Sequence, residues 1–265
     1  MQDTCDPLAR YDEATRTDIA ALRAAIEACP AGKMVFFGGA GVSTESGIPD
    51  FRSADGLYAE QLDVPPEVII SHSYFVAHPA RFFDYYTSRM IARDAQPNAA
   101  HRKLAELEAA GTLRAVITQN IDGLHQAAGS KRVLELHGSV LRNYCEDCGA
   151  FYDLDGMLAA RTASLEAGGD GVPRCTREGC GGIIKPDVVL YEEALDGQVM
   201  REAVNAIRSA SLMVIAGTSL AVYPAAGLVD YFSGNNLVII NRSPTPRDLA
   251  ANLVIRANVG DVLNW

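Results

Sequence analysis

A large doubly wound, Rossmann-like α/β domain with a small zinc-binding domain is predicted by three features of the sequence. Short apolar runs typical of buried strands recur along the chain, and amphipathic helical patterns lie between them. This alternation indicates a parallel sheet covered by helices on both faces. The third feature is a pair of closely spaced cysteine pairs, which indicates the small domain. The expected strands are residues 34–37, 113–118, 188–190, 212–216, 237–240 and 253–255.

Length and charge restrict the class of protein. A chain of 265 residues suits one large core with a small appended module. Hydrophobic content of 48% and charged content of 21% are ordinary for a folded globular protein. The net charge of −10 opposes broad attraction to nucleic acid or anionic lipid, so we expect neither partner. A basic peptide suits this surface better.

The first 16 residues are acidic and lack an apolar core, which predicts neither a secretion signal nor a transit peptide. No apolar run reaches the length of a membrane span, so we expect a cytoplasmic protein. Cys5 has no partner that its spacing suggests. A helix follows, with Thr15 or Thr17 as its N-cap and Pro30 with Gly32 at its end. Its apolar face comprises Ile19, Leu22, Ile26 and Cys29.

A glycine-rich loop over residues 38–52 follows the first expected strand. Gly38, Gly39 and Gly41 lack Cβ atoms and allow positive φ, so backbone N–H groups could converge on an anion. Ser43 and Thr44 add hydroxyl donors at an expected helix start, whose dipole would favour a phosphate. From shape alone, a tight turn that uses glycine for steric reasons is an equal alternative.

The segment after this loop predicts a helical cover. Residues 53–96 hold several aromatic residues with broken periodicity and prolines at 65, 66 and 79, which indicates short helices over a ligand. A longer helix is expected from Asn98 to Gly111. We expect residues 15–53, 91–143 and 183–265 to form the Rossmann-like domain, 54–90 the cover and 144–182 the zinc-binding domain.

Two polar segments follow expected strands and are candidates for chemistry. Residues 119–125 lie at the carboxyl edge of the sheet, where ligands bind in open α/β folds, although on this segment alone a simple turn is the better explanation. His137 follows a second apolar run, and an imidazole can accept a hydroxyl proton near neutral pH. A hydrogen-bonded packing histidine is the alternative, and His125 is the nearest competitor for the role of base.

Four cysteines predict a structural zinc site. Cys145 and Cys148 form one pair, and Cys175 and Cys180 form the second. Four thiolates at this spacing suit tetrahedral Zn²⁺ and leave no open position for water or substrate. Disulfides are the alternative, but a reducing compartment disfavours them.

Together these motifs resemble those of the sirtuins, the NAD-dependent protein deacylases. The resemblance spans Lys33 to Asp261 and rests on the loop 38–52, the segment Thr118–His125, the Leu-His-Gly motif at His137 and the cysteine pairs. It departs at Gly38, where the family usually has threonine. The fold and activity it implies are a Rossmann-like NAD-binding enzyme that transfers an acetyl group from lysine to ADP-ribose and releases nicotinamide.

The resemblance also implies roles for individual residues. Gln119 and Asn120 would contact the nicotinamide ribose, Ile121 and Asp122 the nicotinamide carboxamide, and His137 would be the general base. The implied catalytic residues are His137, Asn120 and Asp122. The implied NAD-binding residues are Gly39, Ala40, Gly41, Thr44, Asp50, Phe51, Arg52, Gln119, Asn120, Ile121, Asp122, His137, Gly217, Thr218, Ser219, Asn241, Val259 and Asp261.

Residues 185–193 and 217–224 would sandwich the acyl-lysine peptide. By themselves they indicate core strands or edges that could accept an added strand. The family commonly has glycine where this chain has Glu192. The implied peptide-binding residues are Val189, Leu190, Tyr191, Leu220, Val222 and Tyr223.

Other activities are weighed against deacetylation. The chain could be an ADP-ribosyltransferase or NAD hydrolase, or a peptide-binding module without catalysis. The loop lacks the GxGxxG spacing of a conventional dehydrogenase. Desuccinylase-type sirtuins carry a Tyr-x-x-Arg pair, and alignment puts Phe83 and Tyr86 at its positions. Tyr86 and Arg89 show that spacing one turn later, which we interpret as accidental.

Overall fold

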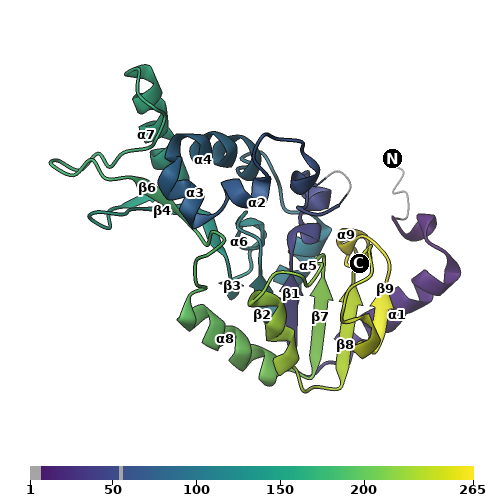
Figure 1. The fold of residues 1–265 in the computed structure, drawn as a ribbon. Helices are drawn as coiled ribbons and strands as arrows, with labels where there is room; N and C mark the ends of the chain where they lie inside the picture. The colour runs from purple at the N-terminus through teal and green to yellow at the C-terminus, as the bar shows by residue number, and fades with distance from the viewer. Residues whose placement is uncertain (1–6, 54–55) are drawn as a thin grey trace, which may run out of the picture.

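The computed structural model describes residues 7–53 and 56–265. Cys5, considered above, lies outside them. The largest element is a parallel sheet of strand order β3-β2-β1-β7-β8-β9, the doubly wound order predicted (Figure 1). From β1 the strand order proceeds outward through β2 to β3, and from β7 it proceeds outward on the other side through β8 to β9. The topological switch point therefore lies between β1 and β7. Its strands are β1 Met34–Gly38, β2 Leu113–Thr118, β3 Val133–Glu135, β7 Leu212–Ala216, β8 Asn236–Ile240 and β9 Leu253–Ile255.

The strands form where apolar residues run without interruption, because both faces of the sheet are covered. Every residue of β1 and β7 is buried. On one face, α1 Glu13–Glu27, α5 Ala99–Ala109 and α9 Val259–Val262 cover side chains such as Phe36. On the other face, α8 Gly197–Arg208 and η6 Ala225–Tyr231 cover side chains such as Phe37. The predicted two-faced α/β architecture is therefore confirmed.

A smaller antiparallel sheet of order β5-β4-β6 carries the cysteine pairs. It contains β4 Gly138–Cys145, β5 Phe151–Asp153 and β6 Ile184–Val188, with α7 Leu154–Glu166 beside it. Figure 1 shows this module at the upper left, next to the short cover helices and above the parallel sheet. The cover consists of η4 Leu57–Ala59, α2 Pro66–Ile69, α3 His72–Ala77, α4 Pro79–Tyr85 and the π-helical turn η5 Tyr86–Met90.

The cover and the small module share one buried core. Phe75, Phe82 and Phe83 of the cover pack with Met157 and Ile184 of the small module. The remaining short elements are η1 Pro7–Arg10, η2 Ala40–Val42, η3 Thr44–Ser46, α6 Leu124–Ala127 and η7 Asp248–Ala250. None of the helices described in residues 7–53 and 56–265 has the length and hydropathy needed to cross a bilayer.

Two predicted boundaries are wrong for local reasons. Helix α1 begins after Asp12, whose side chain accepts a hydrogen bond from the backbone N–H of Thr15. Thr17 instead lies inside the helix and donates to the carbonyl of Glu13. The strand expected at 188–190 is β6, which ends at Val188 and belongs to the small sheet.

Candidate functional site

A cleft of ≈ 450 Å³ opens at the carboxyl ends of β1 and β7, where the strand order reverses. At such a point the connections after two adjacent parallel strands lead to opposite faces of the sheet, which leaves room for a ligand between their loops. The cleft is lined by the glycine loop, the segment 119–122, His137, the segment 188–193 and the loop 217–219. The predicted motifs therefore meet in one place.

The glycine loop packs directly on the loop after β7. Gly41 donates its N–H to the carbonyl of Gly217 at 2.8 Å, and Gly39 donates to Ala216 at 3.1 Å. A Cβ built on Gly41 would lie 2.7 Å from the Cα of Gly217. These glycines are thus required for the contact between two backbones, and their N–H groups are engaged within the protein.

The expected helix after this loop is absent from the described residues. Ala40–Val42 and Thr44–Ser46 form two short 3₁₀ turns, η2 and η3. The predicted contribution of a helix dipole to anion binding is therefore wrong for this loop. The hydroxyl of Ser43, predicted as a ligand donor, bonds inside the protein instead.

Ser43, Asn120 and Asp122 form a polar cluster in the cleft wall. The Ser43 hydroxyl donates to Asp122 Oδ2 at 2.6 Å and accepts from Asn120 Nδ2 at 2.9 Å. Asp122 also caps α6 by accepting from the backbone N–H of Leu124. The cluster fixes the rotamers of Asn120 and Asp122 and joins the loops after β1 and β2.

His137 lies in the cleft between β3 and β4, directly before the first residue of β4. Its Nδ1 is 3.0 Å from the carbonyl oxygen of Gln119, which can only accept a hydrogen bond. Nδ1 therefore carries the proton, and Nε2 holds the free lone pair. Burial lowers the pKa of His137, partly offset by that hydrogen bond. The imidazole is thus neutral at pH 7 and able to accept a proton.

His125 is not the competing base. It is 1% exposed and lies outside the cleft lining, with its ring 4.7 Å from that of His101. Burial lowers the pKa of both rings. Within the described residues, neither ring nitrogen of His125 has a hydrogen-bond partner. His125 is a packing residue beneath the cleft wall.

The predicted peptide edge is partly closed by hydrogen bonds. The N–H groups of Val189 and Tyr191 donate to His137 and Ile70, and that of Leu190 donates to the side chain of Glu193. Among the residues described, Glu192 retains an unpaired N–H at the rim of the cleft. Among these four residues, the available N–H is therefore at Glu192, one residue beyond the predicted edge.

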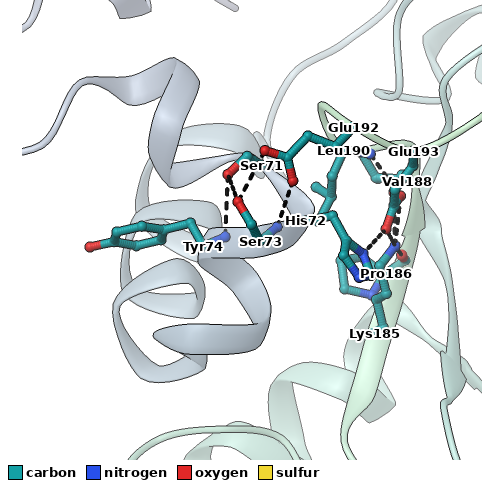
Figure 2. A network of polar contacts seen from close by, with 10 residues as sticks. All are labelled: Ser71, His72, Ser73, Tyr74, Lys185, Pro186, Val188, Leu190, Glu192 and Glu193. Carbon is teal, nitrogen blue, oxygen red and sulfur yellow. Dashed lines mark hydrogen bonds and ion pairs between the residues drawn. The ribbon is translucent and has the colours of Figure 1, made fainter.

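Glu192 ties this rim to the cover. Its φ is 77°, which is strained for a residue with a side chain. Its carboxylate accepts hydrogen bonds from the N–H and hydroxyl of Ser73 at 2.9 and 3.0 Å. Figure 2 shows this contact beside a second one, in which Glu193 lies between His72 and Lys185.

The cover and the loop after β8 add cleft residues that were not predicted as site residues. The Tyr58 ring lies 5.3 Å from that of Phe51, and its hydroxyl is 3.0 Å from the hydroxyl of Tyr191. Arg242 lies 3.6 Å from the carboxylate of Asp50. Neither residue belongs to a recognisable motif, so no local pattern marks either of them as a site residue.

Tyr86 and Arg89 do not form a pair. Tyr86 is fully buried and stacks on Phe82 at 5.6 Å, whereas Arg89 lies at the cleft and bonds to Glu60 at 3.0 Å. Their spacing is therefore accidental, as expected.

Most predicted binding residues line the cleft, and two do not. Leu220 is 4% exposed and packs in the sheet core. Asp261 is 6% exposed and bonds to Arg10 and Tyr11. The other predicted NAD- and peptide-binding residues line the cleft: Gly39, Ala40, Gly41, Thr44, Asp50, Phe51, Arg52, Gln119, Asn120, Ile121, Asp122, His137, Val189, Leu190, Tyr191, Gly217, Thr218, Ser219, Val222, Tyr223, Asn241 and Val259.

The four cysteines meet in the small module. Their Sγ atoms all lie within 4.8 Å of one another, with Cys145 to Cys180 at 3.5 Å and Cys148 to Cys175 at 3.7 Å. Zn–S bonds of about 2.3 Å in a tetrahedron separate the sulfurs by roughly 3.8 Å, and a disulfide requires about 2.05 Å. The donor set therefore fits Zn²⁺ and excludes these disulfide pairs. None of the four lines the cleft.

Comparison with known proteins adds independent findings. Residues 39–224 match the family model described as the Sir2 family. An NAD-dependent protein deacetylase of Clostridium perfringens is 57% identical over 233 residues, covering 87% of this chain and 91% of the relative. One from Clostridium acetobutylicum is 54% identical over 232 residues, with coverages of 87% and 91%.

Solved structures give the same result. A Sir2 structure with a p53 peptide and NAD⁺ has a TM-score of 0.78 and 38% identity, covering 92% of this chain and 95% of that chain. A Sir2 variant with deacetylated p53 peptide and 3′-O-acetyl ADP ribose has a TM-score of 0.82 at the same identity and coverages.

Proposed function

Because this chain belongs to the Sir2 family, we propose that it is an NAD-dependent protein deacetylase, which transfers the acetyl group of a protein lysine to ADP-ribose and releases nicotinamide. The relatives are named for that activity, and the similar structures contain NAD⁺ or an acetylated peptide. The observation in this chain that carries the proposal is a neutral imidazole, His137, in the same cleft as the Ser43–Asn120–Asp122 cluster.

Nucleotide binding is assigned to the walls of the cleft at the switch point. NAD would supply an anomeric carbon that bears a neutral leaving group. The fixed amide and carboxylate of Asn120 and Asp122 would orient the nicotinamide ribose and carboxamide, and Gln119, held by Thr218 at 3.0 Å, would contact the ribose. Such prior ordering contributes to rate because little orientation entropy remains to be lost.

His137 is assigned as the general base. Its Nε2 would accept a proton from a ribose hydroxyl, while the Gln119 carbonyl holds the opposite nitrogen and so fixes the tautomer. Asp261 does not line the cleft, so we assign it an indirect part at the adenosine end, beside Asn241 and Val259.

The acetyl-lysine peptide is assigned to the rim between two chain segments. Glu192 on one side and Ser219, Val222 and Tyr223 on the other line the cleft. The unpaired N–H of Glu192 supports strand-like pairing there. The buried Tyr86 offers nothing to a distal carboxylate, which favours acetyl over succinyl groups.

We retain the three-part division proposed from the sequence, with wider limits for the small domain. The separate antiparallel sheet supports such a domain, and its strands β4 and β6 extend beyond the expected range 144–182 on both sides. A cytoplasmic location is supported by four unpaired thiols arranged for zinc, which persist in a reducing compartment. Cell fractionation with a specific antibody would test this location.

The decisive experiment replaces the imidazole. His137→Ala removes the proton acceptor, so acetyl-peptide-dependent nicotinamide release should fall by about 10²- to 10⁴-fold while zinc content stays at the wild-type value. Tyr231→Phe, on the exposed surface of η6, is the control. Retained deacetylation in His137→Ala would refute the assignment. Nicotinamide release by wild type without acetyl-peptide would indicate NAD hydrolysis instead.

The pH profile tests the same group. Because burial lowers the pKa of His137 below its ordinary value of 6.5, the imidazole stays neutral as pH falls through 6.5. We expect the acidic limb of kcat/KM to have its midpoint below pH 6.5. A midpoint above that pH would contradict the assigned base.

A further inference from the structure

We propose that the segment Pro7–Tyr11 positions the nucleotide end of the cleft, with Tyr11 as the positioning residue. This inference rests on the proposed function, because it concerns the affinity for NAD. It begins from an unexpected contact: a segment near the start of the chain packs on residues 258–261, which lie near its end. These residues include Asn258 and Val259, which line the cleft.

The hydroxyl of Tyr11 connects two groups of this C-terminal turn. It donates to Asp261 Oδ2 at 2.7 Å and accepts from the backbone N–H of Asn258 at 3.1 Å. Burial is the main cause that raises the pKa of Tyr11, so the phenol remains a donor at neutral pH. One side chain thus fixes the backbone at Asn258 and the side chain of Asp261.

Asp261 is saturated by these contacts. Besides Tyr11, its carboxylate accepts from Arg10 at 2.8 Å and from the side chain of Asn258 at 3.1 Å. At 6% exposure it has little access to solvent. Its hydrogen bonds therefore serve to hold the turn in place, which explains why it does not line the cleft itself.

The same turn is held from the opposite direction by the glycine loop. Glu45, the neighbour of the cleft residue Thr44, accepts a hydrogen bond from the N–H of Gly260 at 2.5 Å. A Cβ on Gly260 would lie 2.6 Å from that carboxylate, so a larger residue would displace the Glu45 side chain from this contact. The nucleotide end is therefore bounded by three segments far apart in the sequence, and Tyr11 is the contact supplied by the first.

The test is Tyr11→Phe in the full chain, which keeps the ring and removes the hydroxyl. Asn258 N–H and Asp261 each lose one partner, so we expect KM for NAD to rise roughly fivefold to tenfold. The kcat and the KM for acetyl-peptide should stay within twofold of wild type, a separation that general destabilisation would not produce. Tyr231→Phe, outside the cleft, should change none of these constants.

NAD titration calorimetry without peptide gives a second readout that does not depend on turnover. The dissociation constant of Tyr11→Phe should rise by the same factor, and Arg10→Gln, which loses a half-exposed ion pair, should show a smaller rise. An unchanged NAD affinity in Tyr11→Phe, or equal losses in both KM values, would overturn the inference. If wild type binds NAD but does not deacetylate, the proposed function fails and the titration still decides the role of Tyr11.

Discussion

The two walls of the cleft are held by different kinds of interaction. The wall at the ends of β1 and β7 rests on the parallel sheet, and its loops meet backbone to backbone at Gly41 and Gly217. The opposite wall, formed by the cover and the small module, rests on an aromatic core, carboxylate contacts such as Glu192 to Ser73, and four thiolates. The first wall leaves no room for added atoms, whereas the second depends on side chains and on an ion.

Loss of zinc should reveal the difference in stability between the two walls most clearly. Structural zinc contributes on the order of 10 kcal/mol to small thiolate domains, so Cys148→Ser should reduce deacetylation to background. Hydrogen exchange should increase in β4 and β6, while β1 and β7 remain protected. The control Cys29→Ser alters a cysteine outside the cluster. Equal loss of protection in both sheets would show that the walls are not independent.

A single methyl group in the first wall should have the next largest effect. Gly41→Ala places Cβ against the Gly217 backbone, and such overpacking costs about 1–3 kcal/mol. We expect a lower Tm and a higher KM for NAD. Gly197→Ala, which meets only the flexible guanidinium of Arg201, is the matched control. A Gly41→Ala protein as stable as that control would mean that the two loops are free to separate.

Loss of a side-chain contact in the second wall should have a smaller effect, and two substitutions of Glu192 would show this. Glu192→Ala keeps the strained φ and loses both contacts to Ser73, so stability should fall by about 1–2 kcal/mol and KM for acetyl-peptide should rise severalfold. Glu192→Gly loses the same contacts but relieves strain of roughly 1 kcal/mol, so its effect should be smaller.

Thermal unfolding and peptide kinetics would compare these two variants. Glu202→Ala, on α8 and outside the cleft, serves as the control for loss of an acidic side chain. If Glu192→Gly were the more damaged variant, the backbone strain at this position would have no energetic weight.

The difference between the walls also explains how much the sequence predicted. The strands Leu113–Thr118, Leu212–Ala216 and Leu253–Ile255 were predicted at their observed limits, because mostly apolar runs are typical of strands in a sheet covered on both faces. The strand predicted at 188–190 is instead β6 at Ile184–Val188. Its limits depend on pairing with β4, whose residues are about forty positions away, and no local pattern encodes that pairing.

Site residues follow the same division. The motif residues around Asn120 and His137 were identified because polar groups at strand ends have recognisable spacing, and they lie in the cleft. Tyr58, Arg242 and Tyr11 were missed because each contacts residues that are far away in the sequence. The three-residue turns after β1 were mistaken for a helix start, because glycine and serine suit either structure.

The position of Gly138 has a consequence for how the site is assembled. Its φ is 75°, and a Cβ there would lie 1.9 Å from the carbonyl oxygen of Asp187. This tight crossing lets the His137 carbonyl accept from Val189, so the imidazole and the segment leading to Glu192 share one hydrogen-bonded ladder. The separation between the imidazole and the rim at Glu192 is thereby a property of the folded chain, built in before any ligand arrives.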